Sequence, residues 1–89
     1  MSIIIKKNIN LSLKFVYSEN NSLSVIFHDN NLLMGVVGEF NKNLKELEKI
    51  TQSNLYSRGN SILIKSNPQT NEIVKNAIQF LANQYINNG

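Results

Sequence analysis

The side chains best suited to hold a ligand lie around one turn near the middle of the chain. The stretch Gly38-Glu39-Phe40-Asn41 combines a glycine, an aromatic ring and an amide, and Lys42, Lys45 and Lys49 follow it directly. Residues three and four apart share one face of a helix, so we expect the lysines to form a row. Backbone amides at the start of a helix, with cations beside them, are groups that bind phosphate. The pattern therefore suits a turn that contacts nucleic acid.

Two more candidates follow, Tyr56 in a short strand pattern and Arg58 in the turn after it. An aromatic ring can stack on a base, and a guanidinium can bind a phosphate. Each candidate also has an ordinary structural interpretation. Tyr56 can pack on its own sheet, the lysine row can be a solvated face that Glu46 and Glu48 partly neutralise, and the turn can simply join two helices, with Asn41 capping the second. Both interpretations stay open.

No arrangement of side chains in the sequence suits catalysis. The chain has no Cys and one His, so it offers neither a thiolate nor a zinc ligand set. His28 stands beside Asp29, but two ligands are too few, and Asp29 is better placed to cap a helix. The acidic residues show no pairing for acid–base work, and no Gly-x-x-x-x-Gly-Lys-Ser/Thr stretch is present to hold a nucleotide. We expect no catalytic residue, no metal site and no cofactor in this chain.

Length and charge narrow the function further. The 89 residues allow one small domain, and the net charge of +3 permits a phosphate-containing partner without demanding one. No segment approaches the roughly 20 apolar residues of a membrane-spanning helix, and the apolar run near the first residue is too short for a signal peptide. We expect a soluble, cytoplasmic protein with no membrane partner.

The first half of the chain predicts two strands and then two helices. Apolar residues alternate over residues 9–17 and again at Leu23, Val25 and Phe27, with turn chemistry at residues 18–21. Asp29 or Asn30 can cap a helix ending near Val37, by accepting from the amides of Leu32 or Leu33, and Gly38 can end it in the left-handed conformation. A second helix, capped by Asn41, runs to about Gln52 and places on one face Leu44, Leu47 and Ile50.

The second half predicts a hairpin and a long helix. Residues 55–57 and 61–66 read as strands, and Arg58-Gly59-Asn60 supplies the positive φ values of a tight turn. Pro68 is expected at the first helical position. The apolar stripe of that last helix comprises Ile73, Ala77, Leu81 and Tyr85, widened by Val74 and Ile78.

The predicted fold class is α+β, with three helices on one face of a small sheet. Without its first strand, the order is β-α-α-β-β-α, which resembles a eukaryotic-type KH domain with an extra N-terminal strand. KH domains carry a Gly-x-x-Gly loop between their first two helices. Residues 35–38 match those letters, but residues 38–41 fit better, because a helix starts directly after them. In that frame Asn41 replaces the second glycine.

Three blocks make the resemblance more specific. Residues 27–33, 37–44 and 57–65 read FHDNNLL, VGEFNKNL and SRGNSILIK, and they are similar to the N-terminal KH-like domain of PhoH-family proteins. The departures are Val37, where that family often has Phe, and Asn41, where it often has Asp. The resemblance covers residues 22–86, leaving residues 1–21 as an extension and 87–89 as a frayed end. It implies a P-loop ATPase domain, absent from this chain, that would hold ATP and Mg²⁺.

The resemblance implies a domain, separated here from its ATPase, that binds single-stranded RNA and positions it for that ATPase. The expected contacts are Gly38, Glu39, Phe40, Asn41, Lys42, Lys45, Lys49, Tyr56 and Arg58. The alternative is an interaction module that docks on the ATPase domain or forms a homo-oligomer, for which the candidate residues are Phe40, Phe80 and Tyr85. A free-standing KH protein is a third reading.

Overall fold

The computed structural model describes residues 13–88, which form a four-stranded sheet and three α-helices. The elements are β1 (Leu13–Tyr17), β2 (Ser22–Phe27), α1 (Asn30–Val37), the short 3₁₀ turn η2 (Glu39–Asn41), α2 (Lys42–Thr51), β3 (Asn54–Arg58), β4 (Ser61–Lys65) and α3 (Pro68–Asn88). The α+β class is confirmed. Residues 9–12 of the first predicted strand, and most of the predicted 1–21 extension, lie outside the described residues.

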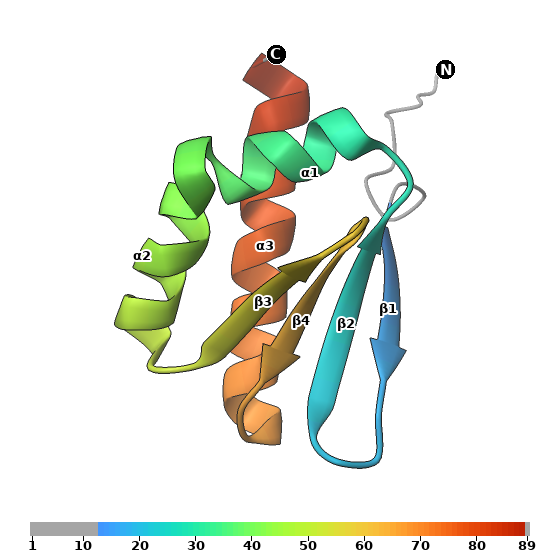
Figure 1. Ribbon diagram of the computed structural model, residues 1–89, viewed down its shortest axis with the longest axis vertical. Coiled ribbons are helices and arrows are strands. Elements are labelled where there is room, and N and C mark those ends of the chain that lie inside the picture. Colours follow the sequence, from blue (N-terminus) through green and yellow to red (C-terminus); the bar gives the residue numbers. More distant parts are fainter. Residues whose placement is uncertain (1–12, 89) are drawn as a thin grey trace, which may run out of the picture.

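The sheet is antiparallel throughout, with the strand order β1-β2-β4-β3. Side chains alternate between its two faces. On the inner face, Leu23 pairs with Ile64 and Val25 pairs with Ile62, and all four side chains are fully buried. Figure 1 shows the helices gathered along one side of the sheet, with α3 passing behind β3 and β4. The hydrophobic core therefore lies between the inner face and the helices.

Helix α3 packs against α1 and the sheet, and its Val74, Ile78 and Ala82 are fully buried. Val74 and Ile78, which were predicted to widen the apolar stripe, are confirmed as buried, but the stripe is wrong at its two ends, because Ile73 is 58% and Tyr85 is 43% exposed. Both stripes have helical spacing, and the sequence pattern alone could not choose between them. The buried stripe is the one that α3 turns toward α1 and the sheet, the elements against which it packs.

Side-chain caps set the N-terminal ends of α1 and α3. Asp29 accepts from the Asn31 amide at 2.9 Å, one residue earlier than predicted, and its backbone carbonyl accepts from the Leu33 amide. Pro68 opens α3 as predicted, and Asn67 Oδ1 accepts from the Thr70 amide at 2.8 Å. These caps satisfy amides that have no partner within the first turn of a helix.

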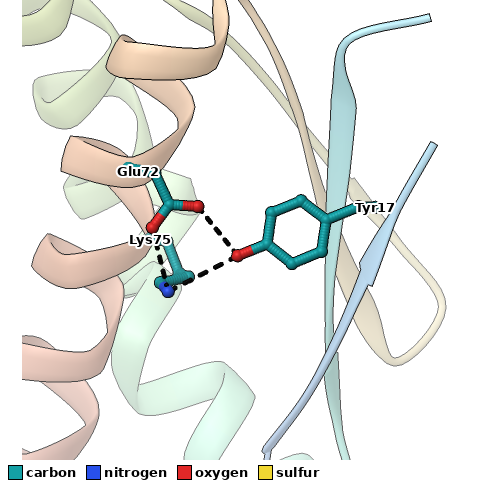
Figure 2. Close-up of polar contacts among 3 residues, drawn as sticks. All are labelled: Tyr17, Glu72 and Lys75. Atoms are coloured by element: carbon teal, nitrogen blue, oxygen red, sulfur yellow. Dashed lines mark hydrogen bonds and ion pairs between the residues drawn. The ribbon is translucent and has the colours of Figure 1, made fainter. Parts of the chain in front are cut away.

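A polar cluster ties β1, an edge strand, to α3 (Figure 2). The Tyr17 hydroxyl donates to Glu72 Oε2 at 2.8 Å, and Lys75 Nζ lies 3.0 Å from Glu72 Oε1 and 3.5 Å from the Tyr17 oxygen. The hydrogen bond from Tyr17, with help from Lys75, lowers the pKa of Glu72, and the contact with Glu72 raises the pKa of Lys75. Lys75 also lies over the Phe15 ring. The cluster is a structural tie between two elements.

Candidate nucleic-acid interface

A groove of about 580 Å³ lies where α1, η2 and the β3–β4 hairpin meet. Leu33, Met34 and Val37 give it an apolar floor, and residues 38–41 form one rim. Ser57 and Gly59 line the opposite side. Four of the nine predicted contacts, the residues from Gly38 to Asn41, therefore belong to one groove. None of these three floor residues was among the contacts predicted from the sequence, because apolar residues on a short helix are normally core residues.

The rim begins at Gly38, whose backbone has φ 78° and ψ 172°. The positive φ agrees with the prediction, but the conformation is extended and not left-handed helical. Only glycine adopts this region readily. A β-carbon at Gly38 would lie 2.8 Å from Asn43 Nδ2 and 2.9 Å from Asn43 Cγ. The glycine lets the chain leave α1, whose last turn closes through the Gly38 amide and the Met34 carbonyl at 3.0 Å.

Phe40 and Asn41 follow in the left-handed helical region, with φ/ψ of 55°/33° and 58°/29°. This region costs a residue such as Phe about 1–2 kcal/mol, whereas Asn tolerates it. The Phe40 side chain is 90% exposed, so no burial compensates for the strain. Strain at a solvent-exposed aromatic residue is a pattern typical of binding sites.

The predicted cap at Asn41 is wrong, because its side chain makes no capping hydrogen bond to α2. The left-handed backbone differs from the β-region conformation that a capping side chain requires. A different side chain stabilises this junction: Asn43, inside α2, donates from its Nδ2 to the Val36 carbonyl at 3.1 Å. This bond holds the end of α1 against the start of α2. Its signal in the sequence, one Asn among several, is too weak to find.

Lys42, Lys45 and Lys49 line a separate shallow depression of about 410 Å³ on α2, together with Glu46, Glu39 and Phe40. Within residues 13–88, none of these lysines forms an ion pair. Of the two glutamates expected to offset the row, Glu46 lines the depression, whereas Glu48 Oε2 accepts a hydrogen bond from the Leu55 amide of β3 at 2.8 Å. Phe40 belongs to both this depression and the groove.

The β3–β4 hairpin borders the groove through Ser57 and Gly59, whereas the predicted contacts Tyr56 and Arg58 do not line it. Side chains alternate along β3, so Leu55 and Ser57 face the helices while Tyr56 and Arg58 point to the opposite side of the sheet. Both side chains are exposed. The structure therefore divides the predicted contacts among three places, namely the groove rim, the α2 depression and the outer side of the sheet.

The described residues hold no cluster of three or more His, Cys, Asp or Glu side chains that could bind a metal ion. The resolved pKa shifts, at Glu72 and Lys75, belong to the tie on β1. That strand lies at the sheet edge opposite β3 and the groove. Within residues 13–88 no helix is both long enough and apolar enough to cross a lipid bilayer.

Comparisons of the chain with family models, with curated proteins and with solved structures give no match. The expected relation to PhoH-family and KH domains therefore stays a hypothesis drawn from residue patterns and element order.

Proposed function

We propose that this chain binds single-stranded nucleic acid, with RNA as the first candidate, across the groove and the neighbouring α2 depression. The observation that carries the proposal is the position of Phe40. Its backbone is strained, its side chain is exposed, and it lines both the apolar groove and the depression that contains the lysine row. Unpaired bases suit the apolar floor and the ring, and phosphates suit the lysines.

The charges indicate where the bases and the phosphates of the bound strand lie. The groove itself contains Glu39 and no cation, so a phosphate is unfavourable there. The α2 depression contains three lysines against Glu39 and Glu46. We therefore place the bases in the groove and the backbone over α2. Three neutralised phosphates would give a log–log salt slope of at most about 2 for a single strand.

The proposed fold family is KH-like, supported by the order β2, α1, α2, β3, β4, α3 and by a glycine turn between the first two helices. The proposed parent is a PhoH-like protein, in which this domain would present RNA to a P-loop ATPase carrying ATP and Mg²⁺. That second step rests on the three sequence blocks alone.

Fluorescence anisotropy with a labelled oligouridylate of roughly 12 nucleotides tests the proposal. Phe40→Ala should weaken binding about 10-fold, because one stacked base is worth about 1–3 kcal/mol. Lys42→Gln and Lys45→Gln should each reduce the salt slope by about 0.7. Phe80→Ala is the control, since Phe80 is an exposed ring on α3 that lines neither the groove nor the α2 depression. Equal affinities for Phe40→Ala, Phe80→Ala and the unmodified chain would refute binding at the groove.

A second candidate function is a protein-interaction or oligomerisation module. It is favoured by an apolar depression of about 230 Å³ between α2 and α3, lined mainly by Leu47, Ile50, Ala77, Phe80 and Leu81. Ile50 and Phe80 are 69% and 60% exposed. The occupant would be the ATPase domain of a PhoH-like parent or a second copy of the chain. Sedimentation velocity of Ile50→Asp and the unmodified chain tests self-association, which the substitution should abolish.

A further inference from the structure

The outer face of the sheet, directed away from the helices, is a second surface with ligand-binding character. The side chains of Val16, Ile26, Tyr56 and Leu63 form its apolar middle. Tyr56 is 46% exposed and Leu63 is half-buried, whereas the inward residues Leu55, Ile62 and Ile64 of the same strands are almost fully buried. Within residues 13–88, then, this face stays open to solvent.

The register aligns these residues into rows. Val16, Ser24, Leu63 and Tyr56 lie opposite one another across all four strands. Tyr56 and Leu63 are direct partners on neighbouring strands, so the ring has an aliphatic side chain at about 5 Å between β-carbons. The row forms a continuous strip with an aromatic ring at the β3 edge.

Cations flank this strip. Lys14 and Arg58 stand at the two ends of the next row, about 14 Å apart across three interstrand spacings. Lys65 lies on the other side of the strip, paired with Asn54. None of the four strands contains an Asp or Glu. The charges that the strands present on the outer face are therefore all positive, which makes this face complementary to an anionic chain.

We propose that the outer face is a second binding surface for single-stranded nucleic acid. One base stacks on Tyr56 beside Leu63, and the flanking phosphates contact Lys14, Arg58 and Lys65. An acidic peptide would satisfy the cations but leave the ring without a planar partner, and a duplex would keep its base planes covered. An unpaired strand supplies both bases and phosphates.

The inference extends the proposed function, because it takes the same ligand through different side chains. The two surfaces meet at the β3–β4 hairpin. Ser57 and Gly59 line the groove, while Arg58 between them points to the outer face. A single strand can therefore pass around the end of the hairpin from one surface to the other.

The experiment is photo-crosslinking of the full chain to an oligouridylate of roughly 12 nucleotides containing 5-iodouridine, with the crosslinked residue identified by mass spectrometry. Anisotropy titrations of Tyr56→Ala and Tyr56→Phe accompany it. We expect a crosslink at Tyr56, about 10-fold weaker binding by Tyr56→Ala and retained binding by Tyr56→Phe, which keeps the ring. Urea unfolding checks that the variants are folded. Lys14→Gln with Lys65→Gln, both exposed, gives a second test if Tyr56→Ala does not fold.

The outcomes separate the two surfaces. Crosslinks confined to Phe40, with normal binding by Tyr56→Ala, would overturn the outer face and leave the groove. Crosslinks confined to Tyr56, with normal binding by Phe40→Ala, would refute binding at the groove and leave the outer face as the binding surface. Absence of binding at salt as low as about 50 mM would overturn both. A dimer without RNA that Tyr56→Ala makes monomeric would identify a self-association face and overturn the proposal.

Discussion

Replacement of Gly38 by alanine tests whether the rim of the groove depends on a glycine. The backbone there has φ 78° and ψ 172°, a region that costs other residues about 1–3 kcal/mol. The new methyl group would also lie 2.8 Å from Asn43 Nδ2, which donates to the Val36 carbonyl. Displacing that half-buried bond costs about 1 kcal/mol more. We expect Gly38→Ala to lower the free energy of unfolding by about 2–4 kcal/mol.

Gly59→Ala is the matched control. Gly59 also has a positive φ, of 57°, but no atom lies within 4 Å of its would-be β-carbon. Its cost is about 1 kcal/mol of backbone strain, partly offset by the reduced entropy of the unfolded chain. Urea unfolding followed by circular dichroism measures both variants. Their difference corresponds to a midpoint temperature gap of roughly 10 °C in a domain of this size.

A third variant isolates the contact between the two residues. In an Asn43→Ala background the side-chain contacts at 2.8 and 2.9 Å are absent, and the nearest remaining atom is the backbone nitrogen of residue 43 at 3.3 Å. The additional cost of Gly38→Ala should then fall by about 1 kcal/mol. If Gly38→Ala is as stable as Gly59→Ala, or if its cost is unchanged in the Asn43→Ala background, the geometric reasoning fails.

Three further predictions concern the rim, α2 and the tie on β1. Phe40→Gly should leave the stability unchanged or raise it by up to about 1 kcal/mol in urea unfolding, while RNA affinity falls; a clear loss of stability would show that the ring supports the fold. Glu48→Ala should cost about 1–2 kcal/mol by removing the acceptor of the β3 amide, whereas Glu46→Ala, which is exposed, should stay within about 0.5 kcal/mol. The hydrogen bond from Tyr17 lowers the pKa of Glu72. The ionised Glu72 carboxylate therefore stabilises the fold at neutral pH, and this stabilisation is lost as the pH falls through the lowered pKa. Melting curves of Glu72→Gln and the unmodified chain should therefore differ at pH 7 and converge in acid, and a constant gap would contradict this assignment.

Secondary structure was predictable where local chemistry decides it. The alternation at Leu23, Val25 and Phe27 predicted β2, and Pro68 predicted the start of α3. Each signal acts within a few residues of the element it specifies. The glycine at position 38 likewise predicted a positive φ, because few other residues tolerate one.

The partners of each side chain depended on contacts that are distant in sequence. The inner stripe of α3 is set by the sheet it meets, so Ile73 is exposed while Val74 is buried. Glu48 appeared to be a surface charge near the lysines, yet it accepts from a strand amide seven residues away. Ile50 kept its apolar spacing but remains exposed on α2.

The candidate site divides in the same way between sequence and structure. Sequence alone identified the rim, since residues 38–41 are contiguous and share one turn. It could not separate Tyr56 and Arg58 from that rim, because the side of the sheet on which β3 presents each side chain is fixed only when the strand pairs and packs. The pairing of β3 with β4 places those two residues on the outer face. Local composition thus selects which residues are available to bind, and tertiary packing decides which of them share a surface.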